Sequence, residues 1–379
     1  MKILHTIPGL SISSGGPSAC TYHLLKGMRK QNIDVNILTL LPKNSNNKII
    51  GNDNFIKAVQ NDTCTPMVYS RNFRNYLRQY NQYDLYHANS IWTYPTHITL
   101  HHALKQDKPC IIAPHGMLYP EALRVSKWKK KITLSLFQRN DLKMANCLQA
   151  TCMHELQHIR DFGLTNPVAV IQNCLNMDDL ETIRNTANTT KLFGFIGRLH
   201  RIKNLESLFN SWVKLGDLTN DAKLLIIGSG DVAYETELHQ CIDKQNIRNI
   251  SFTGFLKGES LIEIFHTLDY LILPSHSENF GMVVPEALIK GIPVIASKGT
   301  PWEELNAYHC GWWVNNDVDT LAATIETAIN TIESKRKEMG ENGRRLVMGN
   351  YSVEVAAEKM IRLYDWILNG GEKPEFVYL

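Results

Sequence analysis

Residues 270–286 read YLILPSHSENFGMVVPE, and this stretch sets the architecture that the rest of the chain repeats. The apolar run Tyr270–Leu273 predicts a buried strand, and apolar residues return at helical spacing from Val283 onward. Between them, Glu278 and Glu286 flank a Phe-Gly turn. A strand that leads through a tight turn into a helix predicts one βα unit of a parallel sheet, with two carboxylates beyond the strand.

The chemistry of these two carboxylates favours a sugar ligand. Sugar and ribose hydroxyls are donors, and a hydrogen bond to a carboxylate is roughly twice as strong as a neutral one. The amides at the start of the following helix attract phosphate. The segment therefore predicts a seat for a nucleotide sugar, while the alternative is a solvated helix face.

The same alternation of short apolar runs and helical patterns fills both halves, which predicts an α/β fold of two doubly wound domains with parallel sheets. A polar boundary is expected at 176–190, between domains at 1–175 and 190–350, and the ligand is expected in a cleft beyond the strand ends. The expected strands are Lys2–Ile7, Ile33–Leu40, Asp84–Ala88, Cys110–Ala113, Cys147–Ala150, Val168–Ile171, Leu192–Ile196, Lys223–Ile227, Asn249–Phe252, Tyr270–Leu273 and Pro293–Ala296.

Composition narrows the setting of the protein. With 379 residues, 44% of them hydrophobic and 20% charged, the chain suits a globular protein of about two domains. No apolar run approaches the roughly 20 residues of a membrane span, and no cleavable signal precedes the first strand, so a cytoplasmic location is expected. The eight cysteines form no C-x-x-C pair, which indicates reduced thiols and no zinc framework.

Charge is distributed unequally along the chain. Residues 1–170 carry 20 Lys and Arg against 9 Asp and Glu, a net +11, and the remainder carries 20 against 28, a net −8. The peak lies in 123–143, where four lysines surround a tryptophan: Lys127, Trp128, Lys129, Lys130 and Lys131. The pattern predicts a basic amphipathic helix, which either lies on an anionic membrane surface or packs its apolar side on the core.

The loops after other expected strands carry further candidates. Gly15 and Gly16 follow the first strand and would let backbone amides approach a phosphate or sugar. Arg198 and Lys203 follow a strand of the second domain and can neutralise a diphosphate. The sequence IIGSGD at 226–231 lacks the third glycine of a dinucleotide fingerprint, so only a turn with exposed amides is expected.

Two histidine patterns need weighing. His115 ends a strand beside a glycine and could donate to a ligand, although a lone histidine is more often structural. HELQH at 154–158 fits the H-E-x-x-H pattern of zinc hydrolases, but no third ligand is evident in the sequence.

Together these motifs resemble family-4 retaining glycosyltransferases of the GT-B fold, in which two Rossmann-like domains face each other across a cleft. The resemblance covers essentially the whole chain and is carried by the glycine pair, APHG, FIGRLHRIKN and SENFGMVVPEAL. HGML, TPWEEL and CGWWV are similar to enzymes that build bacterial surface polysaccharides such as O-antigen, lipopolysaccharide or capsule. The resemblance to this family also implies that the helix expected at 351–368, within the C-terminal segment 351–379, crosses back to the first domain.

The resemblance also implies residue roles. Arg198 and Lys203 would hold the donor diphosphate, Glu286 the ribose, and Leu256 the base, while His115 would contact the donor sugar. Gly15 and Gly16 would approach the diphosphate from the first domain. Where relatives often have P-N-G after the last strand of the first domain, this chain has Gln172, Asn173 and Cys174. The transferred sugar would be held by Glu278, Asn279, Phe280, Gly281 and Met282.

The implied reaction moves a hexose-type sugar from a nucleoside diphosphate, UDP before GDP, to a growing glycan that is expected to be lipid-linked. No metal, cofactor or nucleic acid is expected, and the protein would sit at the inner face of the plasma membrane. A front-face route and a covalent double displacement both remain open. The alternatives are a GT-B nucleotide-sugar epimerase, a non-catalytic nucleotide-sugar-binding protein and, remotely, the zinc hydrolase.

Overall fold

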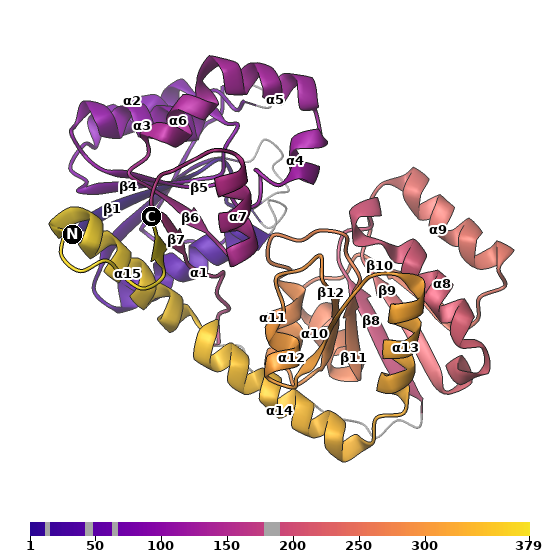
Figure 1. The fold of residues 1–379 in the computed structure, drawn as a ribbon. Coiled ribbons are helices and arrows are strands. Elements are labelled where there is room, and N and C mark those ends of the chain that lie inside the picture. Colours follow the sequence, from indigo (N-terminus) through magenta and orange to yellow (C-terminus); the bar gives the residue numbers. More distant parts are fainter. Residues whose placement is uncertain (12–15, 42–47, 63–66, 178–189) are drawn as a thin grey trace. The chain divides into compact units, whose positions relative to one another are not determined.

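A computed structural model describes residues 1–11, 16–41, 48–62, 67–177 and 190–379 (Figure 1). The chain divides into two compact units, Met1–Asn176 with Ser352–Leu379 and Met177–Tyr351. Each unit is built on its own sheet. The boundary at 176–190 that the sequence predicts lies mostly outside the described residues.

Unit 1 contains an eight-stranded sheet in the order β14-β7-β6-β5-β4-β1-β2-β3. The strands are parallel except for β14, which pairs antiparallel with β7. They are β1 (Lys2–Ile7), β2 (Asp34–Leu40), β3 (Ile56–Val59), β4 (Leu85–Asn89), β5 (Cys110–Ala113), β6 (Cys147–Ala150), β7 (Val168–Val170) and β14 (Val377–Tyr378). The helices are α1 (Gly16–Lys30), α2 (Arg71–Gln79), α3 (Tyr94–Lys105), α4 (Pro120–Arg124), α5 (Lys127–Thr133), the π-helix η2 (Leu134–Gln138), α6 (Arg139–Met144), α7 (Met153–Asp161) and α15 (Val353–Asn369).

Side-chain alternation along the strands of unit 1 produces a core on each face of the sheet. Ile3 belongs to the cluster that contains residues of α1 and α15, and the next residue, Leu4, belongs to the cluster that contains residues of α2, α3 and α7. Helices α1 and α15 approach closely, since a Cβ on Gly27 would stand 2.1 Å from Val353 Cγ1. The C-terminal helix is thus part of the first unit, as the predicted return crossing requires.

Unit 2 contains a six-stranded, fully parallel sheet in the order β10-β9-β8-β11-β12-β13. Its strands are β8 (Lys191–Ile196), β9 (Ala222–Ile227), β10 (Ile250–Gly254), β11 (Tyr270–Leu273), β12 (Val294–Ser297) and β13 (Gly311–Val314). Its helices are η3 (Arg201–Lys203), α8 (Leu205–Leu215), η4 (Gly216–Asp221), α9 (Val232–Lys244), α10 (Glu259–Thr267), α11 (Val283–Ile289), α12 (Glu304–Ala307), α13 (Val318–Ile329) and α14 (Glu333–Asn350).

The strand order of unit 2 fixes where a ligand would sit. From β8 the chain winds outward through β9 to β10, and it then returns to the other side of β8 with β11. The loops after β8 and β11 therefore diverge at a topological switch point, where open α/β sheets bind their ligands. The ring of Phe193 in β8 stacks on Tyr270 in β11, with centroids 5.1 Å apart, and fixes the two strands together.

Candidate active site

An ion pair lies at the switch point of unit 2. Lys203, which ends the short helix η3 after β8, donates to Glu278 Oε1 in the loop after β11. The two side chains are only 18% and 13% exposed. The structure thus brings together two residues that the sequence placed 75 positions apart, and their mutual attraction is stronger than at an open surface because water screens it less.

The loop around Glu278 is held by its own hydrogen bonds. Ser275 Oγ donates to Glu278 Oε1 at 2.8 Å, and the Glu278 amide donates to the Gly299 carbonyl at 2.9 Å. Gly299 allows this close packing, since a Cβ there would lie 2.3 Å from the His276 carbonyl oxygen. These hydrogen bonds hold the Glu278 loop in one conformation, and a binding group that is fixed in this way loses less entropy when a ligand binds.

Cationic side chains gather beside this ion pair. Arg198 is exposed at the end of β8, and the pKa of His200 is lowered by burial and then by the charges of Arg198, Lys203 and Arg201. Arg201 pairs with Glu237 at 2.5 Å and with Glu206 at 3.6 Å. The loop after β8 thus presents a positive end to the sheet, which suits an anionic ligand.

The glycine turn after β9 packs against the loop after β8. A Cβ on Gly228 or Gly230 would come within 1.9 Å of the carbonyl oxygens of Gly197 and Leu199, respectively. The Gly228 amide donates to Gly254, and the Gly230 amide donates to the Glu235 carboxylate. The expectation that IIGSGD exposes its amides to a ligand is therefore wrong at both glycines, because the turn uses those amides to hold the loops together.

The predicted turn from β11 into α11 is present. Gly281 takes φ +78°, a conformation that favours glycine, and Trp302 Nε1 donates to the Phe280 carbonyl at 2.5 Å. Glu286 lies in the first turn of α11, where burial raises the pKa of its carboxyl to about 7 despite the opposing effect of Lys290. The other predicted residues of this unit have these places: Asn279 and Met282 are half-buried in the turn, and Leu256 is half-buried in the loop after β10.

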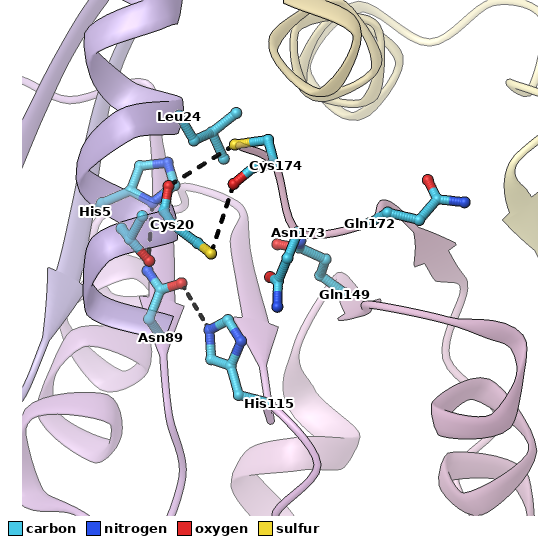
Figure 2. Close-up of a pocket in the computed structure, with 10 residues that line it drawn as sticks. His5, Cys20, Leu24, Asn89, His115, Gln149, Gln172, Asn173 and Cys174 are labelled. Carbon is cyan, nitrogen blue, oxygen red and sulfur yellow. Dashed lines mark hydrogen bonds between the residues drawn. The ribbon is translucent and has the colours of Figure 1, made fainter. Parts of the chain in front are cut away.

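Unit 1 holds a separate small cavity of about 20 Å³, close to the volume one water needs (Figure 2). His115 and Asn173, both among its lining residues, point into the same space. His115 Nε2 is 3.1 Å from Asn89 Oδ1, while its Nδ1 is buried with no hydrogen-bond partner among the described residues. Burial lowers the pKa of His115 to about 4, so the ring is neutral at pH 7.

A buried network that the sequence did not indicate lies behind this cavity. The Tyr364 hydroxyl is 2.7 Å from His5 Nε2 and 2.8 Å from His87 Nδ1, which joins α15 to β1 and β4. Burial, aided by the charge of His115, lowers the pKa of His5 to about 3. No local pattern reveals this triad, since its members stand on three elements far apart in the chain.

The HELQH motif has a structural role in this fold. Glu155 is buried; one carboxylate oxygen accepts from the Gly116 amide, and the other accepts from the Thr151 amide and hydroxyl, both at 2.8 Å. It thereby supports the turn that carries His115, whose φ of 52° is unusual for a histidine. Glu155 is consequently committed to the backbone and is not placed as the base of a zinc hydrolase.

The basic helix that the sequence predicts is present as one continuous helical run over residues 127–144, which begins four residues later than predicted and includes a π-helical turn. Helix α4 ends at Arg124, Ser126 takes φ 53°, and α5, η2 and α6 follow. Lys130 turns inward, donating to the Ala122 carbonyl and lying 5.6 Å from the centre of the Trp92 ring. Exposed side chains form what we call the basic-apolar stripe: Val125, Lys127, Trp128, Lys129, Lys131, Ile132 and Leu136.

Two large apolar members of the stripe are mostly exposed, Trp128 at 66% and Leu136 at 74%. Among the helices of the described residues, none has the length and hydropathy needed to cross a membrane.

Of the two glycines that the sequence predicts at the donor, Gly16 is the first residue of α1, and Gly15 lies outside the described residues.

Comparison with known proteins adds family evidence to this geometry. Residues 14–179 match the model described as Glycosyltransferase Family 4, and residues 177–346 match the one described as Glycosyl transferases group 1. The capsular polysaccharide biosynthesis glycosyltransferase CapM of Staphylococcus aureus is 27% identical over 218 residues, 56% of this chain and 56% of CapM. The chain spans about half the length of the curated relatives it matches.

Solved structures share the fold along nearly the whole chain. The sucrose-phosphate synthase of Thermosynechococcus elongatus superposes with a TM-score of 0.79 at 18% identity, covering 98% of this chain and 100% of the other. HepE of Anabaena, solved with UDP-glucose, gives 0.74 at 18% identity, covering 96% and 99%. The predicted GT-B fold and the predicted family are both confirmed.

Proposed function

This chain belongs to glycosyltransferase family 4, and on that premise we propose that it transfers a hexose-type sugar from a nucleoside diphosphate to a glycan acceptor with retention of configuration. The observation that carries the proposal is the Lys203–Glu278 pair at the switch point of unit 2. It offers a cation for a diphosphate and a carboxylate for sugar hydroxyls at one place. UDP is the favoured nucleotide of the donor, supported by HepE, which was solved with UDP-glucose, and GDP is second.

Different residues of unit 2 would bind the phosphates, the sugar, the ribose and the base of the donor. Arg198 offers a planar fork and Lys203 a point charge for the two phosphates, and the ion pair would loosen as the diphosphate displaces Glu278 from Lys203. Glu278, freed in part, accepts from the transferred sugar beside the turn formed by residues 279–282. Glu286 accepts from the ribose, and Leu256 borders the base. In unit 1, Gly16 and the unpartnered Nδ1 of His115 would face the donor.

Charge development explains how such a site would accelerate transfer. Breaking the bond between the anomeric carbon and the diphosphate leaves negative charge on the leaving phosphate and positive charge on the sugar. Arg198 and Lys203 would stabilise the transition state more strongly than the bound donor, because additional negative charge has already developed on the leaving phosphate. His115 is neutral at pH 7 because of its lowered pKa, so it would orient the sugar by hydrogen bonding and would not repel the oxocarbenium-like charge.

The acceptor side of the proposal rests on the basic-apolar stripe. Its lysines would attract anionic headgroups while Trp128 and Leu136, both largely exposed, would enter the interface. We take the acceptor to be a lipid-linked glycan at that surface, in keeping with the role of CapM in capsular polysaccharide biosynthesis. The chain would then act as a peripheral protein of the membrane.

The decisive experiment is a thermal-shift panel of UDP-, GDP-, ADP- and dTDP-sugars in the presence of EDTA, followed by turnover with the sugar that binds. A ligand at 100 times its Kd stabilises the fold by about 2.7 kcal/mol, so one nucleotide class should stand out without metal. Release of the free nucleotide should then require a glycan acceptor. Conversion of the donor sugar without acceptor would indicate an epimerase, binding without any turnover would indicate a binding protein, and silence from the whole panel would overturn the donor assignment.

A further inference from the structure

Two histidines and an aspartate converge on unit 1 at the junction of α3 and α6, helices that lie side by side (Figure 1). His97 Nδ1 is 2.8 Å from Asp141 Oδ2, and His101 Nε2 is 3.2 Å from Asp141 Oδ1. The histidines are one helical turn apart in α3, so their rings share one face. Among the described residues, this is the group of three His, Cys, Asp or Glu side chains whose ligand atoms all lie within 4.8 Å.

These distances are close to those of a coordination sphere. In a tetrahedral zinc site with bonds of about 2.0–2.1 Å, neighbouring ligand atoms are roughly 3.3 Å apart. The two His-to-Asp separations are already 2.8 and 3.2 Å. The remaining separation between the imidazole nitrogens can close by ring rotation, because the two side chains are 30% and 39% exposed.

The carboxylate is fixed in a way that surface clusters are not. The Asp141 side chain is 2% exposed, and both of its oxygens face the two imidazoles. Burial of a charge is unfavourable unless a partner compensates it, and a divalent cation compensates it more fully than hydrogen bonds from two imidazoles. The exposed edges of the histidines leave an approach for the ion and for one water as a further ligand.

The surroundings show what the cluster would brace. Phe137, in the π-helix η2, packs its ring on His97 with centroids 4.8 Å apart, and Gln138 Oε1 accepts from the Trp92 amide at 2.7 Å. A π-helix is rare and often marks a functional position. An ion held by α3 and α6 would thus fix the segment on which the basic-apolar stripe is carried.

We propose that His97, His101 and Asp141 form a binding site for a zinc-class divalent metal, a structural site separate from sugar transfer. Nitrogen and carboxylate ligands favour late first-row ions such as Zn²⁺, Ni²⁺ or Co²⁺ over Mg²⁺ or Ca²⁺. The site is independent of the donor residues of unit 2, so the donor assay in EDTA and the metal assay fail or succeed separately.

The test titrates the metal-stripped full chain with Zn²⁺ by calorimetry and with Co²⁺ by visible absorption. The wild type should bind one equivalent, give d–d bands and unfold at a higher temperature with the metal. His97→Ala/His101→Ala should weaken binding by more than the 10- to 100-fold that loss of an outer-shell partner typically causes. His101→Gln can still donate to Asp141 but is a poor ligand, so it keeps the fold assessable by circular dichroism while losing the d–d bands.

The chain offers its own matched control in the other histidine pair at the same helical spacing. His154→Ala/His158→Gln changes HELQH, whose Glu155 is committed to the backbone, and should leave metal binding unchanged. Absence of saturable binding in the wild type overturns the proposal, as does binding that the His97 and His101 variants retain. Loss of binding in the HELQH variant alone would move the site to residues 154–158 and would also overturn it.

Discussion

The two units have the same winding but opposite chemistry at their strand ends. In unit 2 the ends of β8 and β11 meet at a charged pair, Lys203 and Glu278, which retains some exposure. In unit 1 the ends of β4 and β5 meet at neutral groups, Asn89 and His115, which line a small cavity. One sheet edge thus presents charged side chains and the other presents neutral, hydrogen-bonding ones.

This contrast runs against the net charge of each part of the sequence. Residues 1–170 carry +11, yet the cavity of unit 1 is uncharged at pH 7. The rest carries −8, yet the loop after β8 in unit 2 gathers Arg198, Arg201 and Lys203. Net charge therefore describes the outer surface, such as the basic-apolar stripe. The chemistry of a site is set by the few side chains that the topology gathers at strand ends.

The largest expected effect comes from removing the cation of unit 2. Lys203→Ala should lower kcat/KM by about 10²–10³-fold, the usual loss when one stabilising donor of a developing anion is removed. The fold should persist, because Ser275 still donates to Glu278. Steady-state release of the nucleotide measures the effect.

The matched control for this change is Lys214→Ala, which removes an exposed lysine paired with Asp319 in the same unit. Its activity should stay near that of the wild type. Full activity in Lys203→Ala would rule out the proposed role of this lysine at the diphosphate. The charged strand ends of unit 2 would then have no demonstrated function to set against the neutral strand ends of unit 1.

The neutral strand ends of unit 1 are tested by measuring the free energy of unfolding. Tyr364→Phe removes the hydroxyl that meets both His5 and His87, so the free energy of unfolding should fall by about 1–3 kcal/mol, the typical loss for unsatisfied buried polar groups. Urea unfolding at pH 7.5 measures it. Tyr378→Phe, at a 38% exposed tyrosine of the same unit, is the control and should change little.

The same unit should also lose stability in acid. The pKa of His5 is about 3 in the folded protein and about 6.5 when unfolded. The unfolded chain therefore binds more protons between these values, and stability falls as the pH decreases from 6.5. A His5→Gln variant that shows the same acid sensitivity as the wild type would contradict this assignment.

Sequence reasoning was strongest where a signal is local. The bounds of β1, β5, β6 and β11 coincide with predicted strands, because a buried strand is a run of apolar residues. The edge strands β3 and β13 were not predicted, since their residues are mostly half-buried. The two residues of β14 gave no signal, because their strand exists only through antiparallel pairing with β7.

The sites divide in the same way. Lys203 and Glu278 were predicted from motifs, although their direct contact was not. The His5–His87–Tyr364 network and the His97–His101–Asp141 cluster were missed, because each joins residues from different elements and only the folded topology brings them together. HELQH shows the converse, since a local motif that matches a metal site serves a backbone turn instead.

A smaller effect would sharpen the charged half of the comparison. Burial raises the pKa of Glu286 to about 7, and a carboxylate accepts a ribose hydroxyl better when ionised. Donor affinity should thus rise about tenfold from pH 6 to pH 8, because one proton is released in that range. Calorimetric Kd values across this range measure it, and the donor phosphates stay ionised throughout.

Glu286→Gln is the control for this titration. Its donor affinity should be weaker at pH 8 and nearly flat with pH, since the amide does not titrate. A variant that keeps the pH dependence of the wild type would assign the titration to another group, and Glu286 would no longer belong to the ribose site.

The smallest effect concerns the surface on which the positive charge of residues 1–170 is concentrated. Lys131→Ala, within the basic-apolar stripe, should reduce binding to vesicles rich in phosphatidylserine by roughly fivefold, because one lysine near an anionic surface contributes about 1 kcal/mol. Sedimentation with vesicles at low and high salt measures it, and salt should narrow the difference. Lys105→Ala, at an exposed lysine that ends α3 outside the stripe, should change binding much less. Equal losses of vesicle binding in both variants would mean that binding depends on net charge alone and that the basic-apolar stripe is ordinary surface. The contrast between the two units would then rest on the chemistry of their strand ends.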